Sequence, residues 1–153
     1  MDILLPDEES VMLLHEMVLM VSPGKEGVHD RKLIIGAIQR PQTYTQYVAD
    51  YDVDTICALL IDSLARNHAF KDGNKRTALM TAIFTYRVNK VHFRATQEMN
   101  MAFDKLIMKV VLNKPNIDEI TTNLKEIRQT YEGQEQSWYE ILAGYISAKI
   151  NHD

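Results

Sequence analysis

The length, composition and charge of this chain exclude several classes of protein. Its 153 residues, 46% of them hydrophobic and 25% charged, suit one soluble globular domain, and the net charge of −4 argues against general electrostatic binding to nucleic acid. A single cysteine cannot form an internal disulfide and fits a reducing compartment. The longest apolar stretch, residues 11–21, includes His15 and Glu16 and is shorter than the ~20 apolar residues that span a bilayer. We therefore expect a cytoplasmic protein that binds neither nucleic acid nor membranes.

Apolar side chains recur at helical spacing along nearly the whole chain, which predicts an all-α fold. The expected helices cover, in order, residues 11–21, 30–41, 53–64, 77–86, 102–111, 116–127 and 136–150. Asp30 and Asn116 are placed to cap two of them, and Pro41 is expected to end the second. Residues 91–94 are a weak strand candidate. The helix at 77–86 is apolar nearly all round, so we expect it to be central and buried.

The strongest functional signal is the run of nine residues from His68 to Arg76, directly before that apolar helix. Unpaired N–H groups and the dipole at a helix N-terminus favour an anion. Asp72 can hold Mg²⁺ together with phosphate oxygens, while Lys75 and Arg76 can neutralise phosphate charge. His68 can take a proton from an incoming hydroxyl, and Phe70 is expected to anchor the loop to the core. The pattern predicts a phosphate-binding loop.

Simpler interpretations of these residues remain open at this point. An Asp-Gly pair is often only a turn, and a lone histidine is often structural. We interpret His15, within the first helix, as structural, whereas His29 could lie near the loop. No histidine pair has the spacing of zinc ligands.

The same nine residues resemble the signature of the Fic/Doc family, H-x-F-x-[D/N]-[A/G]-N-[K/G]-R. Its fixed positions are met by His68, Phe70, Asp72, Gly73, Asn74, Lys75 and Arg76. Arg66 and the segments 27–38 and 77–79 resemble the Doc, or death-on-curing, branch. The resemblance covers about residues 3–131. It implies one Fic/Doc domain over residues 1–153 and an all-α bundle around the central helix, and it leaves unexplained the additional C-terminal helix that the apolar pattern predicts within residues 134–153.

The residue after the conserved asparagine of the signature bears on the reaction. Most Fic proteins have glycine there and transfer AMP from ATP to a target hydroxyl, whereas this chain has Lys75, as the Doc branch does. In that branch the nucleotide lies reversed, and the γ-phosphoryl group is transferred. The resemblance therefore implies a toxin with protein kinase activity that uses ATP and Mg²⁺. Its target would be a hydroxyl of elongation factor Tu, and the result an arrest of translation.

The resemblance also assigns roles to individual residues. His68 would activate the target hydroxyl, Asp72 would hold Mg²⁺, and Arg66 would contact the substrate. The phosphates would be bound by Gly73, Asn74, Lys75 and Arg76.

Regulation and target binding complete the picture that the resemblance implies. Residues 41–51 stand at the place of the family's flap, which pairs with an extended segment of the target, so a small β-hairpin is expected there; a loop packed on the core is the alternative.

The family's inhibitory motif, [S/T]-x-x-x-E-[G/N], has no clean match, since Thr122 to Glu126 is followed by Ile127. Inhibition is therefore expected in trans, from an antitoxin with a disordered tail. Otherwise the helix at 136–150 would cover the site or form a dimer interface, although packing on the core is favoured.

Two other functions stay open on the sequence alone. One is an AMP transferase that acts on another protein, which Lys75 disfavours. The other is a module without catalytic activity that keeps the loop as an anion or nucleotide sensor.

Overall fold

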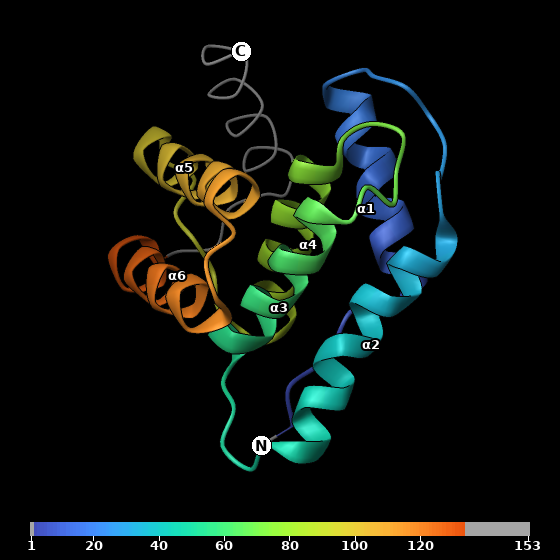
Figure 1. The fold of residues 1–153 in the computed structure, drawn as a ribbon. Coiled ribbons are helices and arrows are strands. Elements are labelled where there is room, and N and C mark those ends of the chain that lie inside the picture. Colours follow the sequence, from blue (N-terminus) through green and yellow to red (C-terminus); the bar gives the residue numbers. More distant parts are fainter. Residues whose placement is uncertain (1, 134–153) are drawn as a thin grey trace.

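The computed structural model describes residues 2–133, which fold into six helices (Figure 1). They are α1 (Glu8–Val21), α2 (Arg31–Tyr47), α3 (Val53–Arg66), α4 (Asn74–Val88), α5 (Gln97–Asn113) and α6 (Ile117–Tyr131). Within these residues β-structure is limited to isolated bridges, so the expected strand at 91–94 reduces to a single bridge between Phe93 and Glu132. The expected helix at 136–150 lies outside the described residues. None of the described helices is long and apolar enough to cross a membrane.

Five of the six helices begin at a side chain that caps them. The caps are Asp7, Asp30, Asp52, Thr96 and Asn116, each of which accepts a hydrogen bond from a backbone N–H in the first turn. Such caps satisfy N–H groups that have no partner within the helix. The two predicted caps, Asp30 and Asn116, are thereby confirmed.

The buried centre of the bundle is a pair of helices. α3 and α4 each bury nine residues and pack against one another, with α1 and α2 on one side and α5 and α6 on the other (Figure 1). The burial expected around residues 77–86 is thus shared equally with α3. Cys57 is among the buried residues of α3.

Two predictions about residues 41–51 are wrong. α2 continues through Pro41 to Tyr47, and residues 48–51 form no strand, so Pro41 does not end the helix and no β-hairpin follows it. Proline removes one N–H from the helix, but tertiary contacts hold this part of α2. Pro41 is buried, and Arg40 binds Asp62 Oδ2 at 2.7 Å and Ser63 Oγ at 2.9 Å on α3.

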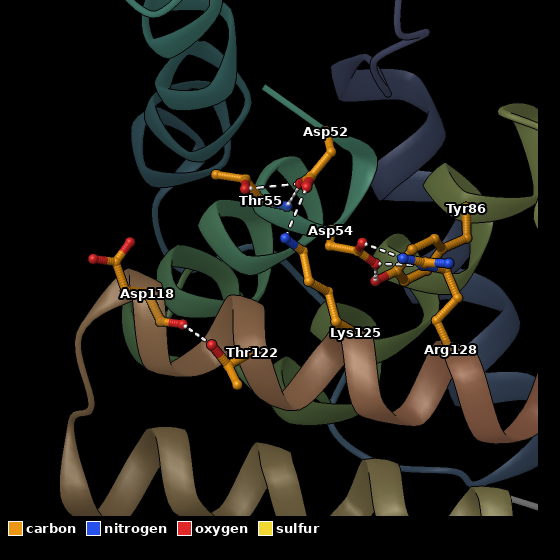
Figure 2. A network of polar contacts seen from close by, with 8 residues as sticks. All are labelled: Asp52, Asp54, Thr55, Tyr86, Asp118, Thr122, Lys125 and Arg128. Carbon is orange, nitrogen blue, oxygen red and sulfur yellow. Dashed lines mark hydrogen bonds and ion pairs between the residues drawn. The ribbon is translucent and has the colours of Figure 1, made fainter. Parts of the chain in front are cut away.

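A buried carboxylate ties α6 to the central pair (Figure 2). Asp54 on α3 is 1% exposed and accepts hydrogen bonds from the Tyr86 hydroxyl at 2.7 Å and from two nitrogens of Arg128, at 2.8 and 2.9 Å. Burial raises the pKa of Tyr86, and the hydrogen bonds to Asp54 raise the pKa of Arg128. The hydroxyl therefore stays protonated and the guanidinium charged. At the edge of this network, Lys125 on α6 pairs with Asp52 at 3.1 Å.

Candidate active site

The loop that joins α3 to α4 carries most of the predicted site and passes close to α1 (Figure 1). It starts at Asn67, the residue that ends α3. The Asn67 side chain donates to the carbonyl of Leu33 on α2 at 3.0 Å and accepts the N–H of Ala69 at 3.1 Å. These two bonds set the direction in which the chain leaves α3.

The connection between α1 and α2 runs antiparallel to this loop. The N–H groups of His29 and Asp30 donate to the carbonyl of Ala69, at 2.8 and 3.0 Å, and the N–H of Lys71 donates to the carbonyl of Gly27 at 3.1 Å. Gly27 has φ of 111°, a conformation that favours glycine. His29 therefore lies beside the loop and supports it through its backbone.

Phe70 and Asn74 close the loop onto the start of α4. The Asn74 side chain accepts the N–H of Phe70 at 3.0 Å and donates to its carbonyl at 2.9 Å, so one amide holds both backbone groups of Phe70. The Phe70 side chain is 3% exposed, which confirms it as the anchor. Asn74 thus has a structural task that the sequence did not indicate.

His15 is the residue of this site that sequence reasoning missed. Its ring stacks on Phe70 with centroids 3.8 Å apart, and its Nε2 lies 2.8 Å from the carbonyl oxygen of Asp72. Because a carbonyl only accepts, Nε2 must carry a proton and donate. A signal was present in the sequence: His15 lies on the apolar face of α1, and a buried polar group there needs a partner.

The Asp72 carboxylate is half exposed and held by three groups. The N–H of Gly73 donates to Oδ1 at 2.8 Å, the N–H of Lys25 donates to Oδ2 at 3.2 Å, and Arg76 Nη2 lies 3.6 Å from Oδ1. A carboxylate has about four lone-pair positions, so one remains available. Within the described residues no group of three or more His, Cys, Asp or Glu could hold a metal. Asp72 could therefore contribute to a Mg²⁺ site only in the mode in which one carboxylate is completed by phosphate and water oxygens.

The N-terminus of α4 differs from those of the other described helices because no side chain caps it. Gly73 takes the capping position with φ of 79°, where glycine is favoured. The first bond of the helix runs from the N–H of Thr77 to the carbonyl of Gly73 at 2.9 Å. The first turn of α4 therefore presents its N–H groups at the end of the helix, an arrangement that suits an anion.

The two predicted cations lie in different places. Arg76 stays at the loop, where its Nη1 donates to the carbonyl of Ser22 at 3.1 Å beside the contact with Asp72. Lys75 extends toward α5, where its ammonium lies 3.7 Å from the sulfur of Met108. The structure therefore brings Arg76 to Asp72 and holds Lys75 toward another helix.

His68 stands exposed between two regions of the site. Its φ of 55° is left-handed, which costs a residue with a side chain about 1–2 kcal/mol, and such strain is concentrated at functional positions. It lines a cleft of about 570 Å³ together with Arg66, whose guanidinium binds Asp62 at 2.9 Å. The described lining of this cleft includes no residue from 69 to 76. Arg66 and His68 thus face the cleft, while Asp72 and Arg76 gather at α4.

A loop so held, with an uncapped helix N-terminus, a reachable carboxylate and an exposed histidine, combines the features that binding of a phosphate group would need. Residues 5–86, which include the whole loop, match the model of the Fic/DOC family, and the chain belongs to that family. It is 36% identical over 102 residues to the Toxin Doc of Mycolicibacterium smegmatis, which is 66% of this chain and 78% of that protein. It is 31% identical over 91 residues to the Protein kinase doc of Escherichia phage P1, which is 60% of this chain and 72% of that protein. The resemblance to the family and to its Doc branch is thereby confirmed.

Proposed function

We propose that the chain is a Doc-like toxin that transfers the γ-phosphoryl group of ATP to a hydroxyl of a target protein. The observation that carries the proposal is the loop itself. Its backbone is fixed by α1, α2 and α4, and it holds the Asp72 carboxylate at the uncapped N-terminus of α4 and the exposed His68 beside the neighbouring cleft. Phosphoryl transfer depends mostly on positioning and on stabilising charge, which such a loop can supply. The names of the two relatives, Toxin Doc and Protein kinase doc, support the same function.

In this mechanism the residues of the loop divide the work. The N–H groups in the first turn of α4 would bind phosphate oxygens, and Asp72 would hold Mg²⁺ while Arg76 keeps its carboxylate in place. A metal held there would supply positive charge that offsets the charge of the phosphates. His68 accepts the proton of the target hydroxyl as its oxygen forms the new bond to phosphorus. The bond from that phosphorus to the bridging oxygen breaks, and ADP leaves.

AMP transfer is the second candidate, and one observation favours keeping it. The argument against it was that the side chain of Lys75 occupies space beside the phosphates. In the structure this ammonium lies 3.7 Å from Met108 on α5, so the lysine is directed away from the loop. Lys75 therefore does not decide between the two reactions. An experiment that identifies the transferred phosphate is needed to do so.

The target and the regulation of the toxin are part of the proposal. By resemblance, the target is elongation factor Tu and the result is an arrest of translation. Thr122, at the start of the imperfect inhibitory motif, donates within α6 to the carbonyl of Asp118 at 2.9 Å (Figure 2). Inhibition by an antitoxin in trans is consistent with this, because that segment is an ordinary part of a packed helix.

A labelling experiment tests the reaction. Purified protein is incubated with Mg²⁺ and cell lysate, in parallel with ATP labelled at the γ- or at the α-phosphate. We expect label from γ-ATP alone, on a band of the size of elongation factor Tu, with none from His68→Ala. His29→Ala is the matched control, because His29 supports the loop through its backbone N–H.

The other outcomes of this experiment are equally clear. Label from α-ATP would make the protein an AMP transferase. Absence of label from both nucleotides would contradict group transfer and favour a nucleotide-binding module. Lys75→Gly tests the role of this lysine: slower transfer from γ-ATP would show that it acts on the phosphates, as its place in the signature implies, and an unchanged rate would show that it does not direct the reaction.

A further inference from the structure

The cleft next to His68 has a positive lining in a chain of net negative charge. It lies between the first half of α2, the end of α3 and the end of α5, and its basic side chains are Lys32, Arg66 and Lys114. The acidic residue among its described lining is Asp62, which is bound by both Arg40 at 2.7 Å and Arg66 at 2.9 Å. The carboxylate is therefore matched by two guanidinium groups, and the exposed lysines leave the cleft with an excess of positive charge.

The backbone at this cleft is unusual as well. Three described residues other than glycine have left-handed φ, namely His68, Lys90 and Lys114, and two of them line this cleft. Lys114 takes the position at the end of α5 with φ of 49°, where glycine is the residue that helices favour. A lysine in that conformation adds a cation to the lining of the cleft at an energetic cost.

The geometry of transfer indicates which reactant would use the cleft. In phosphoryl transfer the attacking and leaving oxygens lie roughly in line with the phosphorus. The phosphates belong at the N-terminus of α4, and His68 is the residue that the loop shares with the cleft. With the phosphates at α4, a hydroxyl that His68 activates would lie beside His68, and the cleft is the space that this side chain lines.

We propose that this cleft binds an acidic segment of the target protein, next to the hydroxyl that is modified. The inference rests on the proposed function, since it assigns the second reactant of the same site. Aspartate or glutamate side chains near the acceptor serine or threonine would pair with Lys32 and Lys114. Because these lysines are exposed, binding should weaken as salt concentration rises.

Gly36 allows a direct test of the charge preference. It lies on α2 in the lining of the cleft, and a Cβ added there meets no atom within 4 Å. Glutamate and lysine both have better helix propensity than glycine, so Gly36→Glu and Gly36→Lys should both fold. They differ in the sign of the charge that they add at one position.

Lys114 and Lys90 give a second matched pair. Both are exposed lysines with left-handed φ, but Lys90 follows α4 and does not line the cleft. Replacement by glycine suits the backbone at both positions. Lys114→Gly removes a cation of the cleft, whereas Lys90→Gly makes the same chemical change elsewhere.

The probe is a fluorescein-labelled peptide with one serine flanked by glutamates, compared with the same peptide carrying lysines. Fluorescence anisotropy measures its binding to the full chain, with and without Mg²⁺ and ATP. We expect the acidic peptide to bind and the lysine-bearing peptide not to bind. Gly36→Glu and Lys114→Gly should each weaken binding about twofold to fivefold, the effect of one exposed charge pair. Gly36→Lys and Lys90→Gly should not weaken it.

Several results would overturn the inference. The first is that the acidic peptide does not bind, and the second is that both peptides bind equally well. The third is that Gly36→Glu and Gly36→Lys lower the affinity for the acidic peptide by the same factor. Displacement of the peptide by ATP without transfer would assign the cleft to the nucleotide and would also reject it. Binding needs no chemistry, so the readout is separate from the labelling experiment. Absent label with the expected binding pattern would refute the kinase function alone.

Discussion

The contact between α1 and the loop predicts a strong effect of replacing His15. His15→Ala removes the ring that stacks on Phe70 and the donor to the carbonyl of Asp72. We expect lower stability and slower transfer, because the Asp72 backbone then loses its tie to α1. The residue contacts neither phosphate nor hydroxyl in the proposed mechanism, so its effect on the reaction acts through the position of Asp72.

The size of the stability loss follows from the two contacts. A stacked ring pair contributes about 0.5–1.5 kcal/mol beyond its buried area, and leaving the partly buried carbonyl of Asp72 unpaired costs at most about 1–3 kcal/mol. His15→Ala should therefore lower the free energy of unfolding by about 2–4 kcal/mol. His15→Phe keeps a ring against Phe70 and loses only the donor, which should cost about 1–3 kcal/mol. His15→Gln keeps a donor and loses the stacked ring, which should cost about 1 kcal/mol.

Urea unfolding followed by circular dichroism gives the stabilities, and label transfer at varied Mg²⁺ concentration reports the position of Asp72. If the hydrogen bond from His15 to the Asp72 carbonyl positions the loop, His15→Phe should need more Mg²⁺ for half-maximal transfer. His15→Gln should need a Mg²⁺ concentration closer to that of the parent protein. A purely structural role would lower stability and leave the Mg²⁺ dependence unchanged. An unchanged Mg²⁺ dependence in His15→Phe would therefore refute the positioning argument.

Three further predictions concern Asp72, the buried ion pair and acid unfolding. Gly24→Ala would place a methyl group 2.2 Å from Asp72 Oδ2, so the carboxylate must move; we expect a higher Mg²⁺ requirement for transfer, and an unchanged one would contradict the assignment of Asp72. Arg128→Met leaves the Asp54 carboxylate buried and unmatched, so urea unfolding should report a loss of about 3 kcal/mol, and a loss below about 1 kcal/mol would show that the pair matters little. Burial raises the pKa of Asp52, but its hydrogen bonds and the nearby ammonium outweigh burial and bring that pKa below its ordinary value of 3.8. A folded-state pKa that is lowered gives stability that is present above pH 3.8 and is lost as pH falls through the folded value. Asp52→Asn still caps α3, and it should make the loss of stability on acidification less steep. Superimposable acid-unfolding curves of the two proteins would show that Asp52 makes no such contribution.

The sequence predicted the parts of the fold that depend on local pattern. Apolar spacing gave an all-helical protein, and the short polar residues Asp30 and Asn116 were identified as caps because their preference is intrinsic to the helix end. The family was recognisable because its signature lies in nine consecutive residues. The assigned roles of His68 and Asp72 stay predictions until transfer is measured.

What the sequence did not predict depends on contacts between distant residues. Pro41 was expected to end α2 on local grounds, whereas the ion pair from Arg40 to Asp62, 22 residues away, helps to hold the helix beyond that point. The bond from His15 to Asp72 spans 57 residues, so only the fold can bring the two together. Lys75 was placed beside the phosphates by its position in the signature, but its ammonium reaches α5.

The Asp54 carboxylate shows that the boundary of sequence similarity is not the boundary of the folding unit. The family match ends at residue 86, in α4, yet the guanidinium that matches this carboxylate comes from Arg128 on α6. A fragment cut after residue 86 would keep the loop and its supports but would lose the cation that stabilises a charge in the middle of the bundle. Exchange of the C-terminal helices between relatives should consequently succeed only when the incoming segment brings a cation to the same place.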